Sequence, residues 1–317
     1  MADVLKSLRV VEVSGIGPGP FAAMMLADLG ASVTAIVRPG EVPMMARGKE
    51  IIELDLKTQL HDLLEMIRTA DVFIEGFRPG VAERLGFGPE VLHEINPKLV
   101  YGRMTGWGQD GPLAKTAGHD INYIAISGAL DAVGRAGGPP QIPVNYVGDF
   151  AGGSLYLVSG ILAGVIAGGG QVVDAAIIDG VAHLQSMTLE MNRAGLWNYE
   201  RGTNVLDSGA PFYDVYETSD GKYLSVGPLE DKFWFEMLSI LQLEVPDRAD
   251  QNNWPEIRNL LTDKFKSRSR DEWTEVFFGT DACVAPVLSL EEAAQFSQNQ
   301  ARNTFGPGGA APAPRFC

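Results

Sequence analysis

Residues 8–37 read LRVVEVSGIGPGPFAAMMLADLGASVTAIV, and this stretch decides the class of fold. Residues 8–14 form an apolar run rich in β-branched side chains, which is typical of a buried strand. A turn of glycines and prolines follows at 15–20, and residues 21–30 predict a helix that ends on a glycine, a common helix stop. Residues 32–37 predict a second strand. A strand, turn, helix and strand in this order indicate a parallel sheet.

The same alternation continues toward the middle of the chain. Strands are predicted at KEIIELDL (49–56), DVFIEGF (71–77) and KLVYGRMTG (98–106), with helices at 59–69 and 89–96 between them. From His119 to about residue 196 the pattern is mostly helical, with the strand GQVVDA in its middle. The first part of the chain is therefore expected to be an α/β domain with a parallel, Rossmann-like sheet.

The second part of the chain follows a different pattern. Two strand-like runs, FYDVYET and KYLSVG, flank Ser219-Asp220-Gly221 and predict a hairpin. Amphipathic helices are predicted around 230–242, 254–267 and 270–278, followed by the strand CVAPVLS. This block is expected to be a smaller α+β domain. We divide the chain into a large domain at 1–190, a linker at 191–210, a small domain at 211–300 and a terminal segment at 301–317 that returns toward the large domain.

Composition excludes several classes of function. The 317 residues carry a net charge of −15, which disfavours binding to nucleic acid because the phosphate backbone is also negative. Residues 1–105 hold 11 basic and 14 acidic residues, so this third is nearly neutral. The two cysteines, Cys283 and Cys317, have no metal-binding or disulfide spacing. The apolar stretch 155–167 is too short for a bilayer, and no apolar signal region opens the chain. We expect a cytoplasmic protein without a metal or a membrane partner.

The turn after the first strand resembles a dinucleotide-binding turn only in part. In GIGPGP (15–20), Pro20 occupies the position of the third glycine of that fingerprint. The second strand is followed by Arg38, where nicotinamide-binding folds carry an acid. Arg38 would suit a ribose phosphate, as in coenzyme A or NADP, or it is a solvated surface residue. Further cations stand near predicted strand ends, where α/β sheets bind ligands: Arg47, Lys49, Lys57, Arg78, Arg84 and Arg103.

A family resemblance rests on segments spread over nearly the whole chain. They are GIGPGPFAA (15–23), GFRPGV (76–81), RMTGWGQ (103–109), GHDINY (118–123), GDFAGG (148–153), GQVVDAA (170–176), GAPFY (209–213) and TDAC (280–283). With these segments in this order, the chain resembles the family III coenzyme A transferases (the CaiB/BaiF family), and within them the α-methylacyl-CoA racemases. The resemblance implies an enzyme of the family III CoA-transferase type whose large domain binds an acyl-CoA thioester.

The resemblance also assigns acid/base roles. Racemisation removes a proton from one face of the carbon beside the thioester and adds one to the other, so two groups must flank that carbon. Imidazole exchanges protons near neutral pH, and His119 in the GHDIN segment is the first candidate. Of the other histidines, His61 and His93 lie on polar helical segments, whereas His183 lies in an apolar helix and is expected in the core.

Three carboxylates complete the predicted catalytic set. Asp149 precedes an apolar helix, so from its position alone it is an N-cap; the resemblance makes it the second acid/base, or the nucleophile that forms a mixed anhydride in the transferases. Glu230 stands at a predicted helix start, and the resemblance makes it the partner that orients His119. The resemblance further implies that Asp120 offers its backbone N–H to the thioester oxygen.

For the coenzyme, the resemblance implies contacts from eight residues. Five are cations, and arginine suits phosphate because its planar fork binds two oxygens at once. The others shape the pocket. The set is Arg38, Arg47, Lys57, Arg78 and Arg84, with Leu54, Gly76 and Tyr123.

The function expected on these grounds is racemisation of 2-methylacyl-CoA thioesters through an enolate, without any cofactor beyond the coenzyme A of the substrate. The resemblance also implies an interlocked homodimer in which the partner chain supplies Glu230. The nearest alternative is coenzyme A transfer with Asp149 as nucleophile, for which no histidine base is needed. A non-catalytic acyl-CoA-binding protein is a further alternative. An NADP-dependent oxidoreductase is disfavoured by Pro20.

Overall fold

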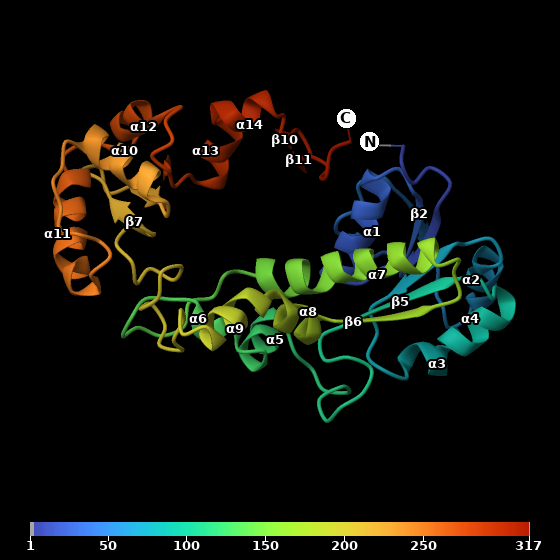
Figure 1. Cartoon of the computed structure of the whole chain (residues 1–317). Helices are drawn as coiled ribbons and strands as arrows, with labels where there is room; N and C mark the ends of the chain where they lie inside the picture. The colour runs from blue at the N-terminus through green and yellow to red at the C-terminus, as the bar shows by residue number, and fades with distance from the viewer. Residues whose placement is uncertain (1–2, 317) are drawn as a thin grey trace. The chain divides into compact units, whose positions relative to one another are not determined.

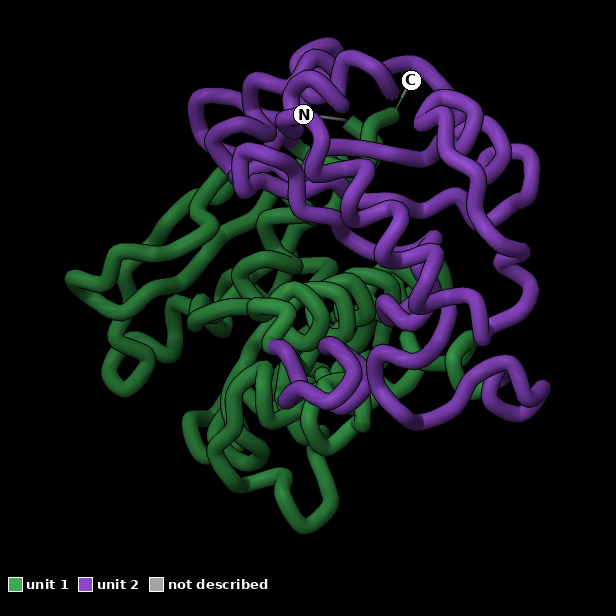
Figure 2. Tube along the Cα trace, turned by 90° about the vertical axis from the view of Figure 1, so that its left-hand side faces the viewer, with its two compact units in different colours: residues 1–130, 142–189, 312–317 green, residues 131–141, 190–311 purple. Residues whose placement is uncertain are grey.

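The computed structural model describes residues 3–316, which divide into two units (Figure 2). Among these residues, the larger unit comprises 3–130, 142–189 and 312–316, and the smaller unit comprises 131–141 and 190–311.

Within the described residues, the larger unit holds a six-stranded sheet in the order β3-β2-β1-β4-β5-β6, and all neighbouring strands pair in parallel. The order is that of a Rossmann-like sheet, in which the chain winds outward in both directions from the central strands. The sequence predicted each of these strands. Their bounds are β1 (Arg9–Val13), β2 (Ser32–Val37), β3 (Lys49–Glu53), β4 (Val72–Glu75), β5 (Val100–Thr105) and β6 (Val172–Ala176).

Helices cover both faces of this sheet (Figure 1). On one face, α1 (Pro18–Asp28) and α7 (Leu155–Ile166) bury Leu26 and Ile161 against strand residues such as Val10. On the other face, the apolar sides of three helices pack around Phe73 and Tyr101. These helices are α2 (Leu60–Ile67), α3 (Val81–Leu85) and α4 (Pro89–Ile95). The sequence did not predict α3, because five residues are too few to show a helical period.

A π-helix, η1 (Tyr146–Ser154), runs directly into α7. Together they form one helix, Tyr146–Ile166, that is long and apolar enough to cross a membrane by length and composition alone. The apolar stretch noted in the sequence, 155–167, covers only the second part of this helix and is too short alone to cross a bilayer. One side of the helix belongs to the core of the unit, because Leu157 and Ile161 lie directly over Gly102 of β5. Burial in the core accounts for part of its apolar character, because 39% of its apolar window is buried.

The π-helix approaches α8 (Ile177–Leu184) closely because glycines face each other there. A Cβ atom on Gly180 would lie 1.8 Å from the carbonyl oxygen of Gly152, so the two backbones touch. The remaining helices of this region are α5 (Asp120–Ile126), α6 (Ala129–Ala132) and α9 (Ser186–Arg193). The glycine pair thus fixes η1, and with it Asp149, on the body of the unit.

The smaller unit is built on an antiparallel sheet in the order β7-β8-β9, and it confirms the predicted hairpin between β7 and β8. Its helices bury Trp234, Phe265 and Trp273 in a common core. The strands are β7 (Asp214–Glu217), β8 (Tyr223–Val226) and β9 (Val284–Pro286), and the main helices are α10 (Asp231–Leu241), α11 (Trp254–Phe265) and α12 (Arg270–Phe277). Shorter elements follow: α13 (Leu290–Gln295), α14 (Ser297–Ala301), β10 (Phe305–Gly306) and β11 (Gly309–Ala310).

The boundary between the units differs from the one drawn at residue 190. Segment 131–141 groups with the smaller unit, because Arg135 forms an ion pair with buried Asp214 and the carbonyl oxygen of Gly138 accepts a hydrogen bond of 2.7 Å from Arg201. Residues 191–210, predicted as a linker, also belong to the smaller unit. Long-range ion pairs of this kind leave no signal in local composition.

Candidate active site

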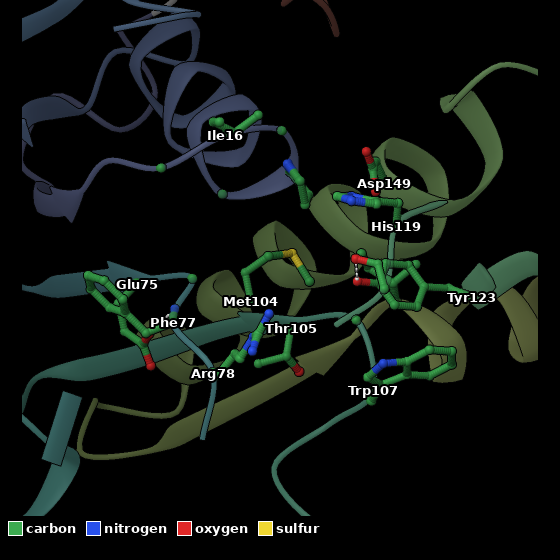
Figure 3. A pocket seen from close by; sticks show the side chains of 18 of the residues that line it. Ile16, Glu75, Phe77, Arg78, Met104, Thr105, Trp107, His119, Tyr123 and Asp149 are labelled. Atoms are coloured by element: carbon green, nitrogen blue, oxygen red, sulfur yellow. Dashed lines mark hydrogen bonds between the residues drawn. The ribbon is translucent and has the colours of Figure 1, made fainter. Parts of the chain in front are cut away.

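A cavity of about 430 Å³ opens at the carboxyl ends of β1, β4 and β5 (Figure 3). The chain turns away from β1 and from β4 in opposite directions there, and such switch points are where α/β sheets commonly bind ligands. The lining comes from four segments: the turn 15–20 after β1, residues 75–79 at the end of β4, residues 104–107 at the end of β5, and 116–120 leading into α5. Asp149 of η1, Tyr123 and Ile177 also line it.

His119 and Asp149 meet in this cavity, and their side chains lie beside each other (Figure 3). His119 is the extended residue before α5, and its backbone N–H donates to Oδ1 of Asn122 at 3.1 Å. Asp149 lies inside η1, and its Oδ2 accepts a hydrogen bond of 3.1 Å from Asn145. The N-cap position predicted for Asp149 is therefore wrong, since Asn145 precedes the helix. The π-helical turn points the carboxylate into the cavity instead.

The turn after β1 comes close to this pair. A Cβ atom on Gly17 would lie 3.6 Å from Oδ2 of Asp149, and Gly17 has a φ of 82°, which favours glycine. The ring of Phe21 packs on Phe150 with 4.8 Å between centroids, and Ser154 donates to the carbonyl oxygen of Pro18 at 2.8 Å. The glycine-proline turn therefore packs directly against η1 and the Asp149 carboxylate.

Asp120 ties the two candidate groups together through its side chain. It is buried, and its Oδ1 accepts the backbone N–H of Asp149 at 2.7 Å. Gly148 allows this approach, because a Cβ atom there would lie 2.2 Å from the same oxygen. Oδ2 of Asp120 has no hydrogen-bond partner among residues 3–316. The sequence predicted a role for the backbone N–H of Asp120, which stays a prediction, and missed the role of its carboxylate.

The environment raises the pKa of both carboxyl groups above its ordinary value. Burial raises the pKa of Asp149 above its ordinary value; the hydrogen bond from Asn145 opposes this rise, and the nearby charge of Asp120 adds to it. Burial likewise raises the pKa of Asp120. A carboxyl group with a raised pKa can both hold and release a proton closer to neutral pH, as an acid/base group must.

Gly76, Arg78 and Tyr123 line the same cavity, and their contact with the coenzyme stays a prediction. The Tyr123 hydroxyl donates to the carbonyl oxygen of Gly118, and its ring meets Trp107 edge to face with 4.7 Å between centroids. These contacts fix Tyr123 in the cavity wall beside Gly118, the residue before His119.

Three more predicted residues, Arg38, Leu54 and Lys57, line a second cavity of about 410 Å³ at the ends of β1, β2 and β3. The two cavities share Val13 at the end of β1, so they are neighbours along one edge of the sheet. Both cationic side chains are exposed there. A long ligand could occupy both cavities at once, with its anionic end at Arg38 and Lys57.

The remaining predicted residues line neither cavity. The Arg47 guanidinium forms an ion pair of 2.5 Å with Asp28 of α1. Arg84 is exposed on α3, and Glu230 is exposed in the smaller unit, immediately before α10. Their proposed contacts with substrate or with His119 stay predictions.

Other expectations from the sequence need correction. Arg103 and Lys49 do not present free charges at the sheet edge, because each is buried in an ion pair. Lys49 binds Glu12 at 2.6 Å, and Arg103 binds Glu75 at 3.1 Å. His183 is exposed rather than in the core, and its Nδ1 lies 2.8 Å from the Tyr156 hydroxyl. Apolar periodicity alone did not reveal which side of that helix faces outward.

Comparison with known proteins gives the family. The model of the family described as "CoA-transferase family III" matches residues 5–307. The chain belongs to this family. It is 44% identical to the alpha-methylacyl-CoA racemase of Mus musculus and 42% identical to that of Homo sapiens, each over 95% of this chain and 82% of the relative. The family agrees with the fold predicted from the sequence, and both of these relatives are named racemases.

A solved structure of the same family supports the fold. The crystal structure of a CAIB/BAIF family protein from Brucella suis superposes with a TM-score of 0.81 and 26% identity, over 98% of this chain and 92% of that chain. The predictions of a family III fold and of a parallel sheet with a second, smaller unit are confirmed.

Proposed function

We propose that this family III protein racemises 2-methylacyl-CoA thioesters by moving the proton on the carbon beside the thioester. The observation that carries the proposal is the convergence of His119 and Asp149, held by α5 and η1, in one cavity at the switch point of the sheet. The likeness to proteins named alpha-methylacyl-CoA racemase supports the choice of substrate.

At the start of the reaction, one of the two groups must be unprotonated to act as the base, and the other must be protonated to act as the acid. Neutral His119 takes the α-proton from one face, and the electron pair moves into the thioester carbonyl to give an enolate. Protonated Asp149 then gives its proton to the opposite face of the same carbon. The reverse direction exchanges the roles, with ionised Asp149 as base and protonated His119 as acid. No electrons are gained or lost overall, so the proposed steps include no redox cofactor.

The coenzyme is proposed to lie along the sheet edge. Its thioester end would occupy the cavity with Gly76, Arg78 and Tyr123, where the backbone N–H of Asp120 would meet the carbonyl oxygen. Its phosphates would reach Arg38 and Lys57 in the second cavity. The set of contacts is completed by Leu54, Arg47 and Arg84.

We further propose that the active form is a homodimer in which Glu230 of one copy supports His119 of the other. The family resemblance supports this arrangement. Light scattering should report a dimer during turnover, and a fully active monomer would refute it. Glu230→Gln should then lower kcat with little change in KM, because Glu230 orients the histidine and does not touch the coenzyme.

Coenzyme A transfer is the second candidate, because the family as a whole is described as CoA-transferase family III. In that reaction the Asp149 carboxylate attacks the thioester carbonyl, expels coenzyme A as a thiolate and forms a mixed anhydride. The test combines two measurements on wild-type enzyme: α-proton exchange on 2-methylacyl-CoA thioesters in deuterated water, and mass spectrometry of Asp149. Exchange without an adduct supports the racemase. An adduct with an acceptor acid, and no exchange, supports the transferase. Binding with neither result indicates an acyl-CoA-binding protein.

Asp120→Asn is expected to change the pH profile of the reaction. The negative charge of Asp120 raises the pKa of Asp149, so its removal should lower that pKa. When Asp149 serves as the base it must be ionised, and the acidic limb of kcat should therefore move to lower pH for the epimer that uses Asp149 first. The amide oxygen of asparagine can still accept the N–H of Asp149. Measurement of kcat against pH for each epimer checks this, and an acidic limb that moves to higher pH contradicts it.

A further inference from the structure

A buried arginine joins the two ends of one loop at the candidate active site. The loop, residues 76–80, follows β4 and precedes α3, and it carries Gly76 and Arg78 at the cavity wall. Arg103 at the end of β5 places its Nε 3.1 Å from Oε1 of Glu75 and its Nη2 2.9 Å from Oε1 of Glu83. Glu75 is the residue before the loop, and Glu83 lies on α3 just after it.

Glu75 also fixes the loop backbone directly. Its second oxygen, Oε2, accepts the N–H of Phe77 at 2.6 Å, so one carboxylate binds both Arg103 and the loop. Glu75 is completely buried, and Arg103 is 7% exposed. A charged network in such a place is costly unless every partner is present, and neither Glu75 nor Arg103 reaches out to a ligand as a free charge.

We propose that Arg103 is a positioning residue: by holding Glu75 and Glu83 together, it fixes loop 76–80 in the shape in which Arg78 meets the coenzyme A ester. This inference rests on the proposed function for the identity of the ligand. The physical reason is preorganisation, because a loop that is already ordered loses less conformational entropy when the ligand binds. The effect therefore belongs to substrate affinity and not to proton transfer at His119 and Asp149.

Arginine is required for this role because its planar fork reaches two carboxylates in different directions. A lysine has one ammonium group on a flexible stem and can satisfy one carboxylate well, but it does not reproduce the fixed bridge. Arg103→Lys is thus the conservative variant that separates a bridging role from a need for positive charge alone.

Removal of Arg103 should leave the sheet folded. Burial raises the pKa of Glu75 to about 7 although the Arg103 guanidinium lowers it, so loss of Arg103 raises this pKa further and lets the carboxyl take up a proton instead of leaving a buried charge. Glu83→Gln offers a milder change. It keeps the side-chain length, so that the Cγ atom of Glu83 can still pack on Gly88. It weakens the contact of Arg103 with residue 83 and leaves the contact with Glu75 in place.

The experiment measures loop mobility and kinetics on the same variants of the full chain. Hydrogen–deuterium exchange of residues 76–80 is followed in ligand-free protein, and KM and kcat are followed with 2-methylacyl-CoA. For Arg103→Lys, we expect about tenfold faster exchange of these amides and about tenfold higher KM, with kcat within about twofold of wild type. Glu83→Gln should give about threefold changes in the same direction.

Glu65→Gln is the matched control. Glu65 forms a helix-surface ion pair of 3.0 Å with Arg68, and its side chain is 49% exposed against 45% for Glu83. The control should change neither loop exchange nor KM. Unchanged exchange and KM in Arg103→Lys, with an active wild type, would overturn the inference, and so would a fall in kcat without a rise in KM. If the wild type neither binds coenzyme A esters nor exchanges α-protons, the proposed function fails, while faster loop exchange in Arg103→Lys still supports the fixed loop.

Discussion

His119→Ala is expected to reduce kcat for racemisation by about 10³-fold, because a positioned acid/base group contributes on the order of 10²–10⁴ to such a rate. The alanine removes the group that faces one side of the α-carbon and leaves Asp149 on the other side. Asp149 can then still remove and return a proton on its own face. The variant should therefore exchange the α-proton of one epimer for deuterium, with retention of configuration, and invert neither epimer.

Chiral chromatography of the hydrolysed acids measures inversion, and mass spectrometry measures exchange. His61→Ala is the matched control, because His61 is exposed on α2 and lies outside both cavities. It should keep wild-type rates. Full racemisation by His119→Ala would contradict this assignment and remove His119 from the mechanism.

Asp149→Asn is the second large effect that we expect. Asparagine has nearly the same shape, so the contacts with Gly17 and with the buried carboxylate of Asp120 can remain. The amide cannot take or give the proton, and inversion should fall by about 10³-fold in both directions. The remaining base, His119, should exchange the α-proton of the opposite epimer from the one that His119→Ala exchanges.

The complementary pattern separates a catalytic loss from a folding defect, since each variant keeps a stereospecific half-reaction. Asp62→Asn on α2 is the control, because Asp62 is also exposed and lies in neither cavity. If both active-site variants exchange the same epimer, the two groups lie on the same face of the substrate, and the two-base account is wrong.

The strands of the large unit were predictable because their signal is local. Val10, Val72 and Val100 lie in runs of apolar, β-branched residues that only a sheet buried on both faces accommodates. The hairpin at Gly221 was predictable for the same reason, since its turn residues lie next to each other in the chain. The five-residue helix α3 has too few turns to produce a period.

The site was predictable only in part. His119 and Asp149 were found because short motifs around them resemble the family. No local sequence pattern indicated the π-helical turn that presents Asp149. The carboxylate of Asp120 and the guanidinium of Arg103 act through partners that are 28 or 29 positions away, Asp149 and Glu75. Such pairs depend on how the helices and strands pack together, which becomes visible only in the folded chain. For this reason the sequence showed Arg103 only as one of several cations near predicted strand ends.

The central claim is that the two groups transfer protons on opposite faces of one carbon. The most direct measurement is a single turnover of a pure 2-methylacyl-CoA epimer by the wild-type enzyme in deuterated water, with separation of the two epimers before mass spectrometry. The account predicts that the inverted product carries one solvent deuterium at the α-carbon from the first turnover onward. Inverted product that retains its original proton, or coenzyme A transfer without any exchange, would contradict it.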